Sequence, residues 1–247
     1  MSNPATGSQG ILRQAYIVTA SHGRALLPVV QTISLNDAFG NTLLDEMGTN
    51  APVLNVQAYD GGTFSFDIFE TDIPTVYALL MDLDPATTKM MVRPEALYQC
   101  KFTFYGNQLS SLTGNPYEGF VAEQCLIQSH DRSQDRNKNM KVTFKGNFTR
   151  ATKVTGLGVL YTRGVKTPGF ATADDVSFTS TTCTLSKVAY ACPDPGLGGT
   201  TTAYLCAIKN KKTMPYGTSG FTLSGSTFTD TAISASDTWD ILTPYAP

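Results

Sequence analysis

The chain has 247 residues, of which 41% are hydrophobic and only 15% are charged, and its formal net charge at pH 7 is −2. This length suffices for one large β domain or two modest ones, and the apolar content excludes wholesale disorder. The balanced charge argues against a dedicated nucleic-acid-binding protein, which holds phosphates with a basic surface. A surface poor in charge suits lateral assembly, because few charges must be desolvated at contacts, although a secreted β protein has a similar composition.

The first ten residues, MSNPATGSQG, lack the basic and apolar regions of a secretory signal, and no stretch approaches the ~20 apolar residues of a membrane helix. We therefore expect the chain to fold in a cytoplasm and to have no contact with a membrane. The odd number and wide spacing of the cysteines favour free thiols over a zinc site, and a bridge among the last three remains open. The cysteines are Cys100, Cys125, Cys183, Cys192 and Cys206.

The small, polar residues 1–11 are interpreted as a flexible N-terminal arm. Two β-like runs follow, over Leu12–Ala20 and Leu27–Leu35. The next segment, Asn36–Ala51, contains two glycines and only a short helix-like patch, so it is predicted to be a long loop. This loop carries four apolar residues, Phe39, Leu43, Leu44 and Met47.

A hairpin and a helix are predicted next. Val53–Tyr59 and Thr63–Glu70 are expected to be strands, joined by a turn at Asp60-Gly61-Gly62. Asp72 is a candidate cap for a helix whose first turn holds Ile73 and Pro74 and whose apolar residues recur at helical spacing. One amphipathic helix among many strands is expected to cover a face or an open end of a sheet.

Three further strands are predicted over Leu97–Tyr105, Phe120–Ser129 and Met140–Arg150, the last two joined by a polar tip at His130–Asn139. Period-two alternation assigns the residues of the last strand to two faces. Its apolar face, expected to point at the core, contains Met140, Val142, Phe144 and Phe148. Its polar face contains Lys141, Thr143, Lys145, Asn147 and Thr149.

Glycines cluster between Gly156 and Pro168, which predicts a boundary there. The remainder, 169–247, is rich in Thr and Ser with short alternating runs, and is interpreted as a small β domain or an extension. The fold class is therefore mainly β, with a β-sandwich or barrel-forming domain, one flanking α-helix and a C-terminal small β domain.

Nothing in the sequence favours an enzyme, a cofactor or a metal site. Only two histidines are present, His22 in a turn and His130, which is expected at the surface of the polar tip. No GxSxG elbow or other setting for a nucleophile accompanies them. We therefore predict no catalytic residues.

The order of elements resembles the tail tube proteins of long-tailed bacteriophages over about residues 25–150. The features that carry the resemblance are the apolar-bearing segment NDAFGNTLLDEMGTNAP, the strand TFSFDIFE leading into the helix DIPTVYALLMDL, the strand LYQCKFTFYGN, and the closing pair GFVAEQCLIQSHDRSQDRNKNMKVTFKGN. Such a closing pair often ends in Phe-x-Gly, here Phe144-Lys145-Gly146.

The resemblance implies a tail-tube β-sandwich domain over 12–160 and a C-terminal domain over 169–247, which is Ig-like in some tube proteins. It implies hexameric rings that stack into a tube, a conduit for DNA ejection in the virion tail, assembled in the host cytoplasm. The partners would be further copies of the chain, other tail proteins such as the tape measure, terminator and baseplate or tip proteins, and genomic DNA that passes without specific binding.

Within this interpretation, Phe39, Leu43, Leu44 and Met47 are candidates for the contact between rings. The candidates for the lumen or the interface within a ring are Glu123, Lys141, Thr143, Lys145 and Asn147, with Glu123 expected to neutralise the lysines. Two alternatives remain open: another virion part, such as a decoration, terminator or baseplate tube protein, and an adhesion or carbohydrate-binding module. Aromatic residues on one exposed face of the C-terminal part, such as Tyr204, Phe221 or Trp239, would support the second alternative.

Overall fold

The computed structural model describes residues 12–19, 21–27, 30–45, 52–69, 73–110, 114–133, 141–166, 175–194, 198–215 and 218–247. The protein is mainly β, as the alternating patterns predicted, and two short helices lie among the described residues. The second helix was not predicted. Neither of these helices is long and apolar enough to cross a membrane.

One antiparallel sheet dominates the N-terminal two thirds of the chain, in the order β2-β1-β5-β6-β7-β4-β3, with β8 paired to β6. The elements are β1 (Leu12–Thr19), β2 (Gly23–Leu26), β3 (Val30–Asp45), β4 (Pro52–Phe69), α1 (Ile73–Leu80), α2 (Pro94–Gln99), β5 (Phe102–Leu109), β6 (Pro116–Ser133), β7 (Lys141–Phe148) and β8 (Arg150–Thr155).

The long strand β6 belongs to both halves of this sheet. Its first half pairs with β5 and β8, and its second half, from Leu126 onward, pairs with β7. Between the halves the register shifts, and Gln124 adopts a φ of 51°. A bulge of this kind bends a strand. The bend lets the two halves of the sheet share one core.

That core is aromatic and is covered by the helices. Phe66 of β4 stacks on Phe144 of β7, with ring centroids 5.1 Å apart, and the edge of Tyr77 from α1 meets the Phe144 ring at 5.5 Å. The predicted core residues Val142, Phe144 and Phe148 are buried here. Met140 lies outside the described residues.

The prediction of a loop over Asn36–Ala51 is wrong as far as Asp45, because β3 continues to that residue as a strand. Its partner β4 also runs without a break through Asp60-Gly61-Gly62, where a turn was predicted. The two glycines serve close packing instead. A Cβ at Gly61 (φ 84°) would lie 2.4 Å from the Phe148 carbonyl oxygen, and one at Gly62 would lie 2.3 Å from that of Asn36. Glycine therefore marks a bulge beside β7 rather than the end of a strand.

The C-terminal third forms a five-stranded sheet in the order β10-β9-β18-β14-β15, a three-stranded sheet β11-β17-β16 and the pair β12-β13. The elements are β9 (Gly158–Val165), β10 (Asp175–Ser177), β11 (Thr182–Thr184), β12 (Cys192–Asp194), β13 (Thr200–Thr202), β14 (Cys206–Lys209), β15 (Lys212–Thr213), β16 (Phe221–Ser224), β17 (Thr227–Asp230) and β18 (Thr238–Tyr245). All five cysteines are free thiols.

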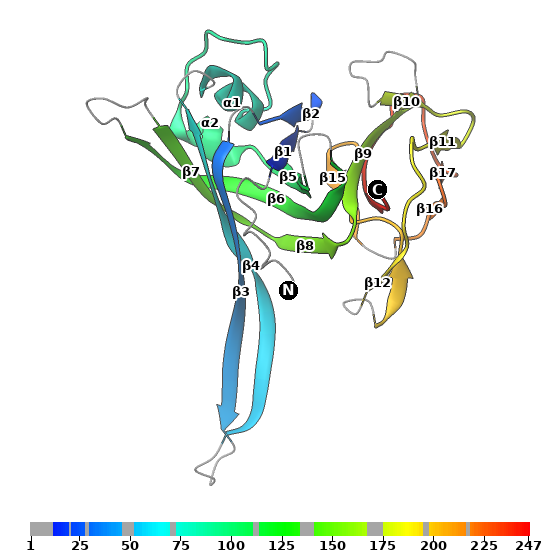
Figure 1. Ribbon diagram of the computed structural model, residues 1–247, viewed down its shortest axis with the longest axis horizontal. Coiled ribbons are helices and arrows are strands. Elements are labelled where there is room, and N and C mark those ends of the chain that lie inside the picture. The colour runs from blue at the N-terminus through cyan, green and yellow to red at the C-terminus, as the bar shows by residue number, and fades with distance from the viewer. Residues whose placement is uncertain are drawn as a thin grey trace, which may run out of the picture.

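The five-stranded sheet packs on the face of β1, β5 and β6 that points away from the helices (Figure 1). Val18, Tyr105 and Val121 from the first sheet contact a cluster that includes Tyr161 and Leu242 from the second. This part of the first sheet is therefore buried on both faces, a situation that favours apolar residues in consecutive positions.

A buried amide joins the two sheets. The side chain of Asn107 on β5 donates to the Val159 carbonyl oxygen (3.0 Å) and accepts from the Val159 N–H (2.7 Å). Asn107 thus bonds both the N–H and the carbonyl group of Val159, a buried residue of β9.

We expect Asn107→Leu to lower the free energy of unfolding by about 1–3 kcal/mol, because two buried backbone groups would lose their partners. Urea denaturation, monitored by the fluorescence of Trp239, measures this loss, because Trp239 is the single tryptophan and lies in the C-terminal third. The control is Gln108→Ala at the neighbouring, half-buried position, with an expected change below about 0.5 kcal/mol. Equal losses in the two variants would contradict the role given to Asn107.

Candidate functional site

The four strands β3, β4, β7 and β6 present a continuous polar surface on the side opposite the aromatic core. Register places the residues in rows across the sheet: Asp67 pairs with Thr143, which pairs with Asp131, and Ser65 pairs with Lys145, which pairs with Ser129. We call this surface the polar face. Its polar residues are Ser34, Thr63, Ser65, Asp67, Ser129, Asp131, Lys141, Thr143, Lys145 and Asn147, and the apolar Leu126 lies in the same row as Asn147.

Carboxylates within the polar face neutralise both of its lysines. The Lys141 Nζ lies 2.6 Å from an Asp67 carboxylate oxygen, and the Lys145 Nζ lies 3.3 Å from one of Asp131. The Thr143 hydroxyl donates to the other Asp67 oxygen at 2.7 Å. The lysine side chains are about half exposed, so the polar face is wet but carries no net charge.

Glu123 does not neutralise these lysines, contrary to the prediction. It lies at the β6 bulge, is 6% exposed and faces the C-terminal sheet. Its Oε1 is 3.9 Å from the Arg150 Nε, and the Cys206 thiol bonds to the carboxyl. Burial raises the pKa of Glu123 to about 7, against the opposing effect of Arg150. Alternation along β6 could have shown that Glu123 shares a face with Val121 and thus a junction with the C-terminal sheet.

A second buried acid lies in the same junction between the sheets. Asp240 of β18 is 3% exposed and accepts a 2.6 Å hydrogen bond from the Tyr161 hydroxyl. Burial raises the pKa of Asp240 to about 6, and the Arg163 guanidinium opposes that rise. Two carboxyls that favour their protonated forms therefore lie between the N-terminal and C-terminal sheets.

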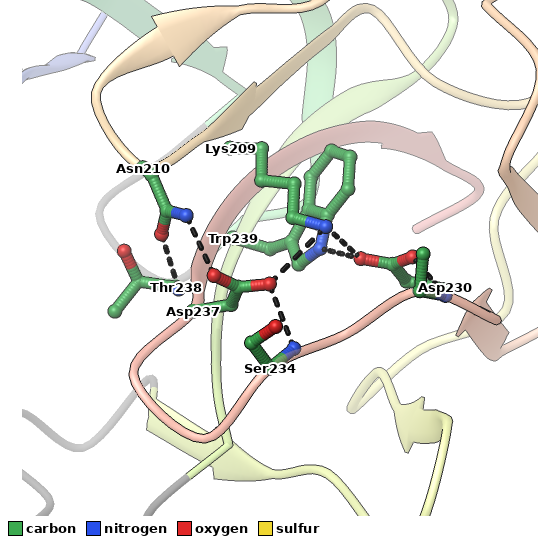
Figure 2. Close-up of polar contacts among 8 residues, drawn as sticks. Lys209, Asn210, Asp230, Ser234, Asp237, Thr238 and Trp239 are labelled. Atoms are coloured by element: carbon green, nitrogen blue, oxygen red, sulfur yellow. Dashed lines mark hydrogen bonds and ion pairs between the residues drawn. The ribbon is translucent and has the colours of Figure 1, made fainter.

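An ion-pair network fixes the chain just before β18 (Figure 2). The Lys209 Nζ lies 2.6 Å from Asp230 and 3.2 Å from Asp237, and the Trp239 indole N–H donates to Asp230 at 2.9 Å. Asn210 donates to Asp237 and accepts from the Thr238 N–H. Every charge is paired, so the network stabilises the fold and leaves no free group for chemistry.

The aromatic residues required by a carbohydrate-binding module are not on an exposed face. Trp239 is 1% exposed and Phe221 is 8% exposed, and both pack in the C-terminal core with Phe228. Tyr204 packs against Phe221 with ring centroids 5.6 Å apart. This alternative therefore loses the feature that would have supported it.

Beyond the sheet, β3 and β4 continue as a two-stranded arm, which extends away from the body (Figure 1). We call residues 38–45 and 52–61 the β3–β4 projection. Phe39 pairs with Tyr59, Leu43 with Asn55 and Leu44 with Leu54 in the backbone register. From Phe39 to Asp45 the projection reaches about 20 Å. Three of the four residues predicted to contact the next ring thus lie on this projection, and Met47 lies outside the described residues.

Three strands lie at the margins of this sheet. Among the described strands, β2 pairs only with β1, β3 only with β4, and β8 only with β6. Open edges are sites where a strand of another chain can pair. The sheet can therefore be extended at β3 and at β8 by neighbouring copies.

The histidines lack a catalytic setting. His130 was predicted at the surface of the polar tip, but its ring stacks on Phe144 (6.2 Å between centroids) and meets the edge of Tyr77 (5.8 Å). It points to the core because it alternates with Ser129 and Asp131 of the polar face. Within the described ranges, no group of three or more His, Cys, Asp or Glu residues could hold a metal ion.

Three solved structures are similar to this chain at low identity. A chain of the anti-feeding prophage baseplate is 11% identical with a TM-score of 0.37, covering 63% of this chain and 98% of that one. The SPP1 tail tube is 12% identical with a TM-score of 0.34, covering 60% of this chain and 78% of that one. An Hcp protein is 10% identical with a TM-score of 0.32, covering 58% of this chain and 98% of that one. No family model and no curated protein matches the sequence. Similarity at this level carries no argument about function, which must rest on the geometry.

The raised pKa of the buried Glu123 predicts how the stability of the fold depends on pH. An acid with a raised pKa stabilises the folded state fully below its ordinary pKa, near 4.5, and that contribution is lost as the pH rises through about 7. Between pH 5 and pH 8, the free energy of unfolding of wild type should therefore fall by about 2–3 kcal/mol relative to that of Glu123→Gln. Asp230 and Asp237 do not interfere, because their lowered pKa values act only below about pH 3.8.

Urea denaturation at pH 5, 6.5 and 8 measures this difference. The control is Glu95→Gln on the exposed side of α2, which should keep the pH dependence of wild type. If Glu123→Gln parallels wild type at all three pH values, the buried carboxyl is not the source.

Proposed function

We propose that this chain is a structural subunit of a tail tube of a long-tailed bacteriophage, in which hexameric rings stack into a conduit for DNA ejection. The observation that carries the proposal is the β3–β4 projection, a two-stranded arm that leaves the body beside a sheet with open edges. An isolated two-stranded hairpin is at best marginally stable in water. A projection of this length therefore requires a partner surface, and a further copy of the chain supplies it.

The open edges supply the contacts within a ring. Pairing of β3 or β8 with strands of adjacent copies would continue the sheet around the ring, and a closed barrel has no exposed edges left to aggregate. The polar face would then line the lumen or the ring interface, with Lys141, Thr143, Lys145 and Asn147 in its wall. A wall whose charges are balanced lets DNA pass without holding its phosphates.

The remaining parts follow from this arrangement. The tube domain corresponds to the predicted range 12–160 up to β9, because β9 (Gly158–Val165) already belongs to the C-terminal sheet. That sheet covers the other face of β1, β5 and β6, away from the lumen. The predicted N-terminal arm, residues 1–11, lies outside the described residues. The partners are further copies of the chain and other tail proteins, the location is the virion tail, and DNA is conducted without specific binding. No enzymatic activity and no cofactor belong to this role.

The double variant Leu43→Asp/Leu44→Asp tests the role of the projection. We expect it to fold but to stack at least tenfold less, because charges would replace apolar residues at the contact between rings. Negative-stain electron microscopy and sedimentation of concentrated protein measure tube formation. The control is Met91→Asp/Val188→Asp, which places the same charges at residues exposed by 72% and 66%.

Long tubes with a central channel from wild type and from the control, but not from the Leu43/Leu44 variant, are the expected result. Normal tubes from that variant would overturn the stacking role. A wild-type chain that stays monomeric at high concentration and in the presence of preformed tube ends would overturn the tube proposal itself.

The charge balance of the polar face makes a separate prediction. Asp67→Asn/Asp131→Asn leaves two unpaired lysines in each subunit, so tubes of this variant should hold DNA, and the binding should weaken steeply with salt. Co-sedimentation of tubes with fluorescent duplex DNA at 50 and 200 mM salt measures it. Adding Lys141→Gln/Lys145→Gln restores neutrality and should abolish the binding. Equal DNA binding by wild type, the double variant and the quadruple variant would contradict the placement of the polar face in the lumen.

A further inference from the structure

A hollow of about 280 Å³ opens where β1 and β5 meet the β14–β15 hairpin of the C-terminal sheet. Its apolar floor is formed by Val18, Phe102 and Ile208, and its rim carries Lys101, Lys211 and Lys212. We call this hollow the lysine pocket. Its volume lies just below the range in which proteins enclose small ligands, ~300–1,000 Å³. It suits a few side chains of a protruding segment rather than a metabolite.

The rim of the lysine pocket is positively charged. Lys101 and Lys212 are exposed, and neither has an ion-pair partner among the residues that the structure describes. Lys211 donates to the Ser21 hydroxyl at 3.1 Å, which in turn bonds to Asp82. The acid in the lining, Asp240, is buried and bonded to Tyr161, so it does not offset the exposed charges.

A tight turn holds the lysines at the rim. Asn210 and Lys211 both have positive φ, 47° and 72°, the conformation of a two-residue hairpin turn between β14 and β15. The Asn210 side chain is bonded to Asp237 and to the Thr238 N–H, which anchors the turn to β18. The network in Figure 2 therefore fixes the side of the pocket that bears Lys211 and Lys212.

One segment of this chain has the complementary composition. Residues 43–47 read Leu-Leu-Asp-Glu-Met, so three apolar side chains accompany two acidic ones; β3 ends at Asp45, and Glu46 and Met47 lie outside the described residues. We propose that this segment of one copy docks in the lysine pocket of the copy in the next ring, with the apolar side chains on the floor and Asp45 and Glu46 at the lysine rim. Burial of the apolar groups supplies affinity, and the charges fix the register.

The positions of the two parts suit an open-ended stack. In Figure 1 the β3–β4 projection extends downward from the body, whereas β15, which bears Lys212 of the lysine pocket, lies in the body between the two sheets. A contact between two different surfaces of a subunit is head-to-tail, and it generates an open stack when the successive copies do not close into a ring. The docking rests on the proposed tube function, because it names the acceptor surface for the projection. It also gives the C-terminal third a share in every contact between rings.

Charge reversal and restoration test the docking. Lys101→Glu/Lys212→Glu and, separately, Asp45→Lys/Glu46→Lys should each lower the sedimentable tube fraction at least tenfold. A chain with all four changes should regain most of it, because the attraction is restored with opposite signs. The control Lys89→Glu/Lys187→Glu changes two exposed lysines that do not line the lysine pocket and should leave tubes unaffected. Circular dichroism and urea midpoints establish that each variant is folded.

A second measurement separates this inference from the tube proposal. Mixed ¹⁴N- and ¹⁵N-labelled chains are treated with a carbodiimide, which joins an amine to a carboxylate only where the two touch. Amide links from Lys101 or Lys212 to Asp45 or Glu46 between differently labelled chains are expected, and mass spectrometry of the peptides detects them.

Each result decides between the two proposals. Tubes from Lys101→Glu/Lys212→Glu, or wild-type tubes without these links, would overturn the docking and leave the tube function standing. Links without tubes would support the docking and overturn the tube. The absence of both from concentrated wild type would overturn both.

Discussion

The bend of β6 is the constraint on which the rest of this structure depends. One strand supplies the edge of two half-sheets, and the bulge at Glu123 and Gln124 turns one half relative to the other. The inner faces then close on the aromatic core under α1, and the outer face of β5 and β6 is left for the C-terminal sheet. Without the bend, the second half of β6 could not pair with β7 while the first half is buried on both sides. The polar face and the β3–β4 projection both follow from that pairing, because β7 holds β4 in place.

The same bend separates the charges of the molecule into two settings. Glu123 and Asp240 lie in the dry junction between the sheets, where burial favours their neutral forms. Asp67 and Asp131 lie on the wet polar face, where each meets a lysine on the adjacent strand. The exposed Lys145–Asp131 pair contributes little to stability, and both pairs remove net charge from the surface. In the proposed tube, that loss of net charge matters more than the small gain in stability.

Alternation and helical spacing predicted the elements whose environment is set locally. The strand β7 was predicted within two residues, and the buried and polar faces of its described residues were assigned correctly. The helix α1 begins at Ile73, as predicted, whereas its candidate cap Asp72 lies outside the described residues. The predictions failed where an interaction between distant segments decides the conformation. Gly61 and Gly62 are typical of a turn, but they allow β4 to pass close to Phe148 and Asn36. Residues 36–45 lack a clear strand pattern, yet they pair with β4 over their whole length.

The sequence by itself determined the mainly β class, the poverty of charge and the two-faced pattern of β7, because period and composition are properties of neighbouring residues. Only the tertiary structure decided which carboxylates meet which lysines, since register across strands brings Asp67 and Asp131 beside β7 and the bulge turns Glu123 away. It also decided that Lys101 and Lys212, more than a hundred residues apart, share the rim of one hollow. Contacts between distant segments depend on how the sheets bend and pack, and no local pattern contains that information.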